Sequence, residues 1–216
     1  MCIVSIFSDE KGDFILTQNR DETCLRPTSK EVETKERYNQ EFTGPVDLVS
    51  GGTWIYYSRK YVACILNGAY RKHSHNPPYK MSRGLVILEL LKYDSIDEFM
   101  DKIDLEGIEP FTMIMIDRLK QEKKILVWDE IEKYKEDVSG EKLIVRSSST
   151  LYTEEEKQEH KQFFLNLNSH EPYEIFKLQD KIKMLENNKF PTVMTTSITQ
   201  IIQSQNEVSL QFCPIM

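Results

Sequence analysis

The strongest constraint on the fold is a pair of short apolar runs at the start of the chain. Residues 3–7 and 14–17 are apolar and rich in β-branched and aromatic side chains, and the polar residues 8–13 separate them. Two runs of this length around a turn-forming segment predict antiparallel strands joined as a hairpin. The chain is therefore expected to begin with a β-sheet.

The register of this hairpin determines what lies beside the start of the chain. If Ser8 faces Asp13, the numbers of paired residues sum to 21. Cys2 then lies beside Asn19, to within about two residues. We therefore expect Cys2 to be close to the polar residues that follow the second strand.

A second pair of β-rich runs lies within residues 53–66. If Tyr57 pairs with Tyr61 across the turn, Asn67 lies opposite Gly51. Polar sites would then end neighbouring strands.

Apolar spacing and capping residues predict helices in the middle and later parts of the chain. The expected helices are residues 83–91, the segment after the capping box 95–98, the segment after the capping box 153–156, and a segment around 175–185. Further strands are expected at 111–116, 124–128, 142–145, 192–202 and 208–213. Strands at both ends around these helices predict a layered α+β architecture.

Length and charge limit the class of protein. A chain of 216 residues with 39% hydrophobic residues can bury a substantial core, so we expect one domain over residues 1–216. The net charge of -7 opposes binding to nucleic acid. No stretch reaches the roughly 20 apolar residues of a spanning helix, so no stable membrane insertion is expected. The oligomeric state is left open.

The cysteines and histidines indicate a reducing location and no metal site. The four cysteines show no C-x-x-C spacing, and the first residues lack a basic start and a completed signal-peptide core. A cytoplasmic protein without disulfides is expected. His73-Ser74-His75 has the residue types of metal ligands, but it fits a polar loop before Asn76-Pro77-Pro78 better, so no metal is assigned.

Cys2 combines two reactive groups once Met1 is removed. Processing enzymes generally excise Met before a residue as small as Cys, which leaves a thiol and an α-amine on one residue. The ordinary pKa of the amine is about 7.7 to 8.0 and that of the thiol is about 8.5, so the amine can accept the thiol proton directly or through water. The alternative interpretation is a small apolar residue at the start of a strand.

Asn19-Arg20-Asp21-Glu22 follows the second strand and brings an amide, a guanidinium and two carboxylates next to Cys2. Asp21 is suited to orient the protonated α-amine, and Arg20 is suited to neutralise Asp21 or to bind a substrate carboxylate. The same residues also fit a strand-exit turn with a surface ion pair.

Gly51-Gly52-Thr53-Trp54 precedes the second hairpin. Its glycines would permit a ligand to approach the backbone closely, with Trp54 as a wall. A tight start of a strand with a core tryptophan is an equal alternative. Asn67 is a candidate oxyanion donor, although Asn followed by Gly is just as readily a turn signal.

Taken in order, Met1-Cys2, Asn19-Arg20-Asp21-Glu22 and Gly51-Gly52-Thr53-Trp54 resemble the transport and Golgi organisation protein 2 family, also called the NRDE family. Similar features at Asn67, at Ser82-Arg83-Gly84 and at residues 147–152 extend the resemblance over nearly the whole chain. The resemblance implies a four-layer αββα sandwich of the N-terminal-nucleophile (Ntn) hydrolase type, similar to the choloylglycine hydrolase and penicillin acylase group, with a cysteine nucleophile. Some eukaryotic members of the family are linked to secretory organisation, mitochondrial physiology and haem movement.

The chain departs from the choloylglycine hydrolase pattern at several positions. There an Arg precedes the Asn, whereas this chain has Gln18 before Asn19 and carries the charge at Arg20. A later Asn of that pattern is replaced within residues 147–149, and the position of its C-terminal Arg falls near Val193, where this chain has no arginine. Bile-salt and penicillin substrates are therefore not carried over.

These features lead to a cysteine Ntn amidohydrolase that cleaves a non-peptide C–N bond in a small amide substrate. Cys2 is the expected nucleophile, Asn67 is the expected oxyanion donor, and Asp21 and Arg20 orient these groups. The expected substrate-binding residues are Asn19, Gly52, Trp54 and Ser148. The alternative is a non-enzymatic intracellular protein that binds or moves haem or a lipid-like ligand in a pocket around Trp54. No cofactor is expected, apart from haem as a ligand in that alternative.

Overall fold

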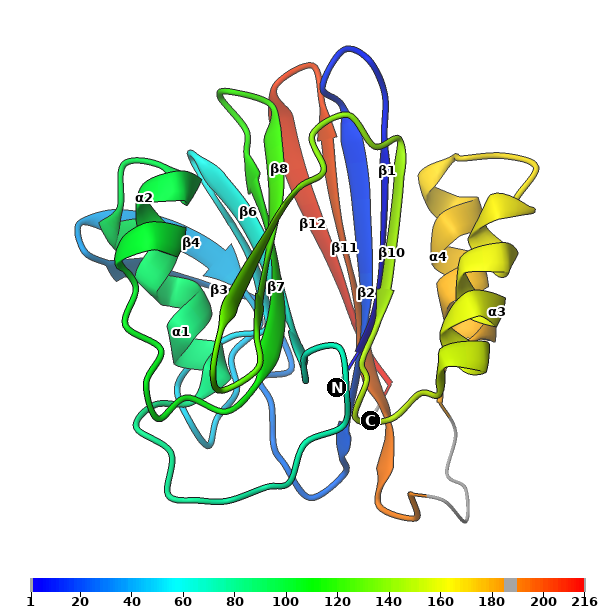
Figure 1. Cartoon of the computed structure of the whole chain (residues 1–216). Helices are drawn as coiled ribbons and strands as arrows, with labels where there is room; N and C mark the ends of the chain where they lie inside the picture. The colour runs from blue at the N-terminus through cyan, green and yellow to red at the C-terminus, as the bar shows by residue number, and fades with distance from the viewer. Residues whose placement is uncertain (1, 185–189, 216) are drawn as a thin grey trace. The chain divides into compact units, whose positions relative to one another are not determined.

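The structure is a computed structural model that describes residues 2–184 and 190–215. The chain forms two compact units, one of Met1–Pro27 with Glu141–Met216 and one of Thr28–Gly140. Each unit contains one antiparallel sheet and its own helices (Figure 1). Two predicted features, the removal of Met1 and the helical position of Leu185, lie outside the described residues. The single domain over residues 1–216 stays a prediction.

The first unit is a five-stranded sheet in the order β10-β1-β2-β11-β12, with every neighbouring pair antiparallel. Helices α3 and α4 lie beside one face of it, at the right of Figure 1. The elements are β1 (Cys2–Ser8), β2 (Phe14–Thr23), β10 (Leu143–Ser147), α3 (Glu154–Leu165), α4 (Pro172–Lys181), β11 (Val193–Ser204) and β12 (Glu207–Pro214).

An apolar core joins the helices to this sheet. Phe164 of α3 and Ile175 of α4 are fully buried and pack with Ile3 and Phe7 of β1 and Val145 of β10. Burial of a side chain of this size contributes about 1.5–3 kcal/mol. The helices are therefore fixed to β1, the strand that carries the start of the chain, and to its neighbour β10.

The second unit is a seven-stranded meander in the order β3-β4-β5-β6-β7-β8-β9. Its strands are β3 (Glu33–Arg37), β4 (Gln40–Gly44), β5 (Ile55–Ser58), β6 (Tyr61–Asn67), β7 (Phe111–Asp117), β8 (Glu122–Trp128) and β9 (Lys133–Asp137). Helix α1 (Arg83–Glu89), the 3-10 turn η1 (Leu90–Lys92) and helix α2 (Ile96–Lys102) separate β6 from β7. Every residue of the inner strand β7 is buried.

The predicted helices are confirmed by their caps and buried faces. Thr153 and Glu156 form the expected capping box at the start of α3, in which each side chain bonds the other's backbone N–H. At α2, Ser95 Oγ accepts from the Glu98 N–H at 3.0 Å, but the Glu98 carboxylate accepts from Asp94 instead of Ser95. That predicted capping box is therefore only half formed.

The first hairpin is confirmed, but its register differs from the predicted one by a single residue. Ser8 pairs with Phe14 rather than with Asp13, and Cys2 pairs with Arg20, one residue beyond its expected partner. The shift makes Arg20, rather than Asn19, the residue directly opposite Cys2 in the ladder.

The turn of this hairpin explains the shift. Asp9 Oδ1 accepts hydrogen bonds from the backbone N–H groups of Lys11 and Asp13, at 2.8 and 2.9 Å. Gly12 adopts a φ of 88°, a conformation that glycine reaches without strain. These contacts stabilise a loop one residue longer than the sequence pattern suggests.

The second hairpin shows the same kind of difference. Tyr57 pairs with Val62 rather than with Tyr61. Ser58 Oγ accepts from the Tyr61 N–H at 2.8 Å and donates to the Tyr61 carbonyl at 3.1 Å, which places Tyr61 in the turn closure. A side-chain hydroxyl thus competes with the ladder for these backbone groups.

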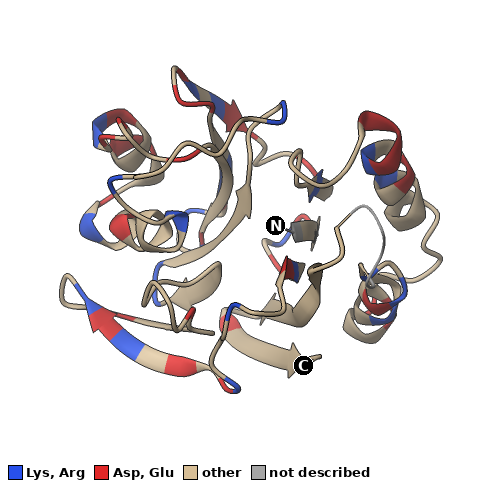
Figure 2. Cartoon of the chain, turned by 90° about the horizontal axis from the view of Figure 1, so that it is seen from below, with Lys and Arg blue, Asp and Glu red and all other residues tan. Residues whose placement is uncertain are grey.

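Strands β3, β4 and β9 have no counterpart among the sequence-based predictions. β3 and β9 form the two edges of the seven-stranded sheet and consist mainly of charged residues. Acidic and basic residues alternate along several segments of the ribbon in Figure 2. Charges protect an exposed sheet edge from pairing with another chain. They also remove the apolar alternation from which a strand is predicted.

None of the helices within residues 2–184 and 190–215 combines the length and the apolarity needed to span a bilayer.

Candidate functional site

The polar residues at the end of β2 lie beside a β-bulge in β11. Asp21 pairs with Thr195 and Arg20 pairs with Ser197, so Thr196 is the extra residue of the bulge. A bulge bends its strand and re-aims the side chains around it, and bulges are common next to active sites.

The bulge holds Arg20 through its side chain and its backbone. Arg20 is buried, its Nη1 donates to Thr196 Oγ1 at 3.2 Å, and its carbonyl accepts from the same hydroxyl at 3.1 Å. Arg20 is also the residue directly opposite Cys2 in the ladder between β1 and β2. The register therefore places a buried guanidinium residue beside Cys2.

Asp21 is a fully buried carboxyl group with two hydroxyl donors. Thr195 donates to Oδ1 at 2.6 Å, and Tyr152 donates to Oδ2 at 2.8 Å. The Thr195 hydroxyl also accepts from the Met184 N–H at 2.8 Å, so its own proton is directed at Asp21. Burial raises the pKa of Asp21 above its ordinary value, and the two hydroxyl donors offset part of this rise.

Tyr152 comes from the turn between β10 and α3, which Ser148 organises. The Ser148 carbonyl accepts from the N–H groups of Leu151 and Tyr152 at 3.2 and 3.1 Å, and its hydroxyl lies 2.8 Å from the Thr150 hydroxyl. Ser148 is thus buried in the turn that presents Tyr152 to Asp21.

His160 supports the Tyr152 ring from α3. The two rings pack edge to face with centroids 4.7 Å apart, and His160 Nδ1 lies 2.9 Å from the Ser147 hydroxyl. Burial lowers the pKa of His160, which favours its neutral form. The imidazole therefore acts here as an aromatic wall for Tyr152.

Asn19 lies against helix α4, on the opposite face of β2 from its neighbour Arg20. Its Nδ2 donates to the Gln179 carbonyl at 3.0 Å, and Gln179 Nε2 donates to the Ile3 carbonyl at 2.9 Å. The Gln179 carbonyl belongs to the last turn of α4, where carbonyls lack partners within the helix. Asn19 thus links β2 to the end of α4.

Gly52 and Trp54 lie in the second unit at the start of β5. A Cβ atom at Gly52 would overlap the carbonyl group of Gly84, and Thr53 donates its N–H to the same carbonyl at 2.9 Å. Close packing against the first residues of α1 thus accounts for a glycine here. Trp54 is buried with 6% of its surface exposed.

Asn67 is the last residue of β6 and is half-buried. It pairs with Phe111 of β7. The described ladder between β5 and β6 begins at Ile55 with Cys64, so the predicted pairing of Asn67 with Gly51 is not formed. Gly51 instead donates its N–H to the Asp47 carbonyl at 2.8 Å.

The first unit therefore brings together four of the predicted site residues, Cys2, Arg20, Asp21 and Ser148, with Asn19 on the helix side of the same strand. Gly52, Trp54 and Asn67 belong to the second unit. Sequence reasoning did not assign roles to Tyr152, Thr195 or Thr196. Tyr152 and Thr195 are 131 and 174 residues from Asp21, and no local pattern reports such contacts.

The two histidines considered as metal ligands bind a carboxylate of their own chain. His73 Nε2 and His75 Nδ1 lie 3.1 and 3.0 Å from Glu109 Oε1, and Arg83 Nη2 lies 2.9 Å from Glu109 Oε2. Burial raises the pKa of Glu109, but Arg83 and the two histidines lower it by more, so the net shift of this pKa is downward. In the described part of the chain, no three His, Cys, Asp or Glu side chains are grouped to hold a metal ion.

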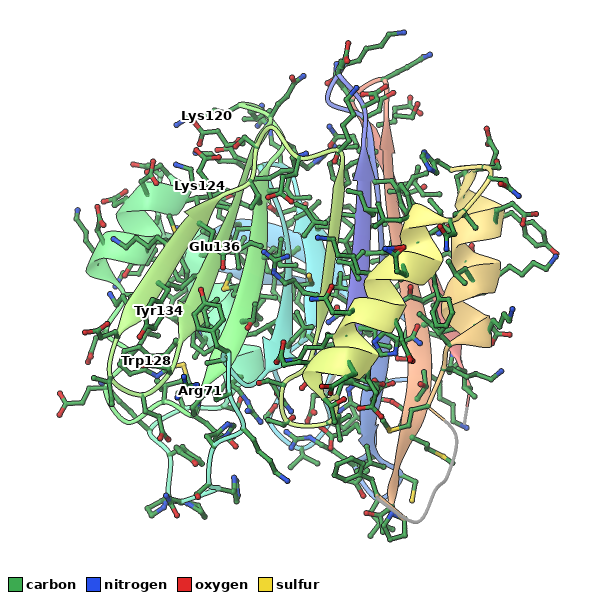
Figure 3. The ribbon with its side chains drawn as sticks, turned by 45° about the vertical axis from the view of Figure 1, so that its right-hand side comes forward. Arg71, Lys120, Lys124, Trp128, Tyr134 and Glu136 are labelled. Carbon is green, nitrogen blue, oxygen red and sulfur yellow. The ribbon has the colours of Figure 1, made fainter. Side chains whose placement is uncertain are left out.

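The loop that carries these histidines is attached to β9. Tyr70 packs edge-on against Tyr134 with ring centroids 5.3 Å apart and donates to Glu136 Oε1 at 3.0 Å. Tyr134 and Glu136 are labelled along the sheet in Figure 3. The start of the loop is therefore held by both an aromatic contact and a hydrogen bond.

Comparisons with known proteins bear on this geometry. A sequence model described as Transport and Golgi organisation 2 matches residues 1–215. Among curated protein sequences, none matches the chain.

Solved structures share the fold at low identity. Penicillin V acylase from Agrobacterium tumefaciens matches with a TM-score of 0.59 and 9% identity, covering 99% of this chain and 86% of the acylase. Two variants of the conjugated bile acid hydrolase from Clostridium perfringens match with TM-scores of 0.57 and 0.56, both at 9% identity. They cover 97% and 100% of this chain, and 92% of the hydrolase in each case. These enzymes have the Ntn-hydrolase fold, so the predicted α+β fold class of the Ntn hydrolase type is confirmed.

Proposed function

The chain belongs to the Transport and Golgi organisation 2 family, and from this premise we propose that it is a cysteine Ntn amidohydrolase that cleaves a non-peptide C–N bond. The observation that carries the proposal is the position of Asp21. It is a buried, doubly hydrogen-bonded carboxyl group, and it directly follows Arg20, the strand partner of Cys2. A charge held in this way next to the start of the chain is suited to bind an α-ammonium group.

In the proposed reaction, removal of Met1 frees the α-amine of Cys2. The amine takes the thiol proton, and the sulfur attacks the carbonyl carbon of the amide substrate. The C–N bond then breaks, the leaving amine takes a proton from the α-ammonium group, and a thioester remains. Water attacks the thioester with the α-amine as base, which releases the carboxylic acid and restores the thiol.

Each of the neighbouring groups has a defined part in this scheme. Asp21, in its ionised form, orients the α-ammonium group, and the positive charge of Arg20 favours the thiolate. Thr195 and Tyr152 are positioning residues, because they act on Asp21 and not on the substrate. Asn67 as the oxyanion donor rests on the family resemblance.

The named neighbours support a hydrolytic class. One is a penicillin V acylase and the other a conjugated bile acid hydrolase, and one variant of the hydrolase carries alanine in place of a cysteine at its second position. This chain also has a cysteine at position 2. Its departures from their pattern around Asn19 and Val193 argue against the same substrates, so we assign a different small amide.

The test compares purified protein with and without Met1. Iodoacetamide labelling of Cys2 is followed from about pH 6 to pH 9, a range that brackets the ordinary amine and thiol pKa values. Intact mass verifies processing, and Cys24, which is exposed in the first unit, is the internal control. We expect Cys2 of the processed form to label faster near neutral pH, with Cys24 unchanged.

Equal labelling rates and equal pH midpoints in the two forms would show that the free amine does not activate Cys2. A screen of acyl-amide substrates then compares the native protein with Cys2→Ala, which should lose turnover. Haem titration of the same two proteins covers the alternative function. Ligand binding without Cys2-dependent turnover would replace the hydrolase with a binding protein.

A further inference from the structure

The first unit contains a cavity of about 550 Å³ at the end of the sheet that carries the β1–β2 turn. Residues of β1, β2, β10, β11 and the α3–α4 connection line it, and Figure 1 shows this turn and this connection at the top of the view. Cys2 and Ser8 begin and end β1, which at about 3.3 Å per residue spans roughly 20 Å. The cavity is therefore separate from the candidate active site.

The inner walls of the cavity are aromatic and aliphatic. The rings of Phe7 and Phe164 lie 6.2 Å apart, and the imidazole of His170 lies 4.5 Å from the Phe7 ring. Leu143 and Ile202 also belong to the apolar lining. A volume within about 300–1,000 Å³ and walls of this kind are typical of sites for small organic ligands.

Carboxylates outnumber cations among the lining residues. Asp9, Asp13 and Glu171 line the cavity, against the single ammonium group of Lys142. That ammonium group already bonds Glu10 at 2.8 Å, and both side chains are largely exposed. The lining therefore has an excess of negative charge.

The carboxylates are held in place without being neutralised. Asp9 and Asp13 accept from backbone N–H groups of the turns, and Asp13 also accepts from the Ser204 hydroxyl at 3.2 Å. Glu171 stands at the start of α4, and its side chain does not cap the helix. Each group keeps acceptor capacity for a ligand.

One buried polar atom of the lining has no partner in the described structure. The Ser8 hydroxyl oxygen is shielded from solvent and forms no hydrogen bond with the described residues. A buried hydroxyl without a partner costs free energy. A ligand with a donor or acceptor group would satisfy it.

We propose that this cavity binds a small cationic amphiphile, with an aromatic or aliphatic body between the Phe7 and Phe164 walls and a protonated amine facing the carboxylates. The apolar body is matched by the walls, and the ammonium group by Asp9, Asp13 and Glu171. Aromatic rings also attract cations through their faces. The net charge of -7 raises the local concentration of such a cation.

The test uses three probes that share a naphthalene ring and differ in charge, titrated into the full chain by calorimetry. They are 2-naphthylmethylamine, 2-naphthalenemethanol and 2-naphthoic acid. We expect the amine to bind about tenfold more tightly than the alcohol, and the acid to bind most weakly. Raising the salt concentration should weaken only the binding of the amine.

Matched variants separate charge from shape. Asp13→Asn and Glu171→Gln, alone and together, should weaken the amine and leave the alcohol unchanged, whereas Ile202→Trp should weaken both by filling the cavity. Glu159→Gln removes an exposed carboxylate of α3 that does not line the cavity, and it should change neither. Labelling of Cys2 should be the same in all four charge variants, so the outcome is independent of the proposed hydrolase.

Several results would overturn the proposal. Equal affinity for all three probes would show that the cavity does not recognise charge. No binding at millimolar probe concentration would show that the cavity is only a packing void. Unchanged amine affinity in the Asp13→Asn, Glu171→Gln double variant would have the same consequence, and this arm holds even if Ile202→Trp fails to fold.

Discussion

Replacing Tyr152 with phenylalanine tests whether Asp21 is held as a hydrogen-bonded carboxylate. The change removes one hydroxyl group and keeps the ring that packs against His160 at 4.7 Å. The lost hydrogen bond is 2.8 Å long and ends on a carboxyl group with no exposed surface, so water does not easily replace the donor. The loss should therefore appear directly in the free energy of unfolding.

The magnitude follows from the charge of the acceptor. A hydrogen bond to a charged group contributes about 1.5–3 kcal/mol, and one between neutral groups about 1 kcal/mol. Where Asp21 is ionised, we expect Tyr152→Phe to lower the free energy of unfolding by about 2 kcal/mol. For a chain of 216 residues this corresponds to a fall in Tm of about 4–8 °C.

The effect should also depend on pH in a defined direction. Below the pKa of Asp21, which burial raises, the carboxyl group is neutral and the lost bond contributes less. The destabilisation should therefore grow as the pH rises through this pKa. Removing the Tyr152 donor should in addition raise the pKa of Asp21 further, because a donor favours the ionised form.

The assay is urea unfolding of the native protein, Tyr152→Phe, Asp21→Asn and the double variant between about pH 5 and pH 8. In the Asp21→Asn background, Tyr152→Phe should cost at most about 1 kcal/mol and lose its pH dependence. Tyr173→Phe, at a position 70% exposed on α4, is the matched control and should change little. The reasoning would be refuted if Tyr152→Phe lowered the free energy of unfolding equally at the two ends of this pH range. An equal loss with and without the Asp21 carboxyl group would refute it as well.

Three further predictions concern the same fold. Asp21 holds its proton more tightly in the folded protein than in the unfolded chain, so its protonation stabilises the fold. This stability is present below the unfolded pKa and is lost as the pH rises through the folded pKa. Thermal melts of Asp21→Asn across pH should therefore show a flatter profile than those of the native protein. Gly52→Ala should lower the free energy of unfolding by about 3 kcal/mol, because the added Cβ overlaps the backbone of α1. Gly140→Ala is the control and should cost nothing, because open space surrounds that position. The two costs are measured from the denaturant midpoints of the variants. Phe164→Ala should cost about 3–5 kcal/mol and the neighbouring, partly exposed Phe163→Ala less than about 1 kcal/mol in the same assay, and similar costs would contradict the described core.

The candidate site shows how far a motif can be interpreted without a structure. The motif placed Arg20 and Asp21 near Cys2, and the described hairpin confirms that neighbourhood. The same motif suggested that Asn19 binds substrate, whereas the structure places Asn19 against α4. Adjacent residues of a strand face opposite sides, so a motif of consecutive residues cannot all face one site.

The sequence by itself determined the elements that depend on neighbouring residues. The apolar runs of β1, β2 and β7, the buried face of α2 and the Thr153 cap were all predictable, because strand period, helix period and capping act over at most a few residues. The charged edge strands were not, because their stability comes from the partner strand and not from their own side chains.

Only the tertiary structure decided which groups meet at the end of β2. The turn at Asp9 set the register and so made Arg20, not Asn19, the partner of Cys2. The bulge at Thr196 and the turn after Ser148 then brought two hydroxyl groups to Asp21 from the far end of the chain. Such contacts arise from strand pairing and helix packing between segments more than 130 residues apart, so no local pattern of residues carries them.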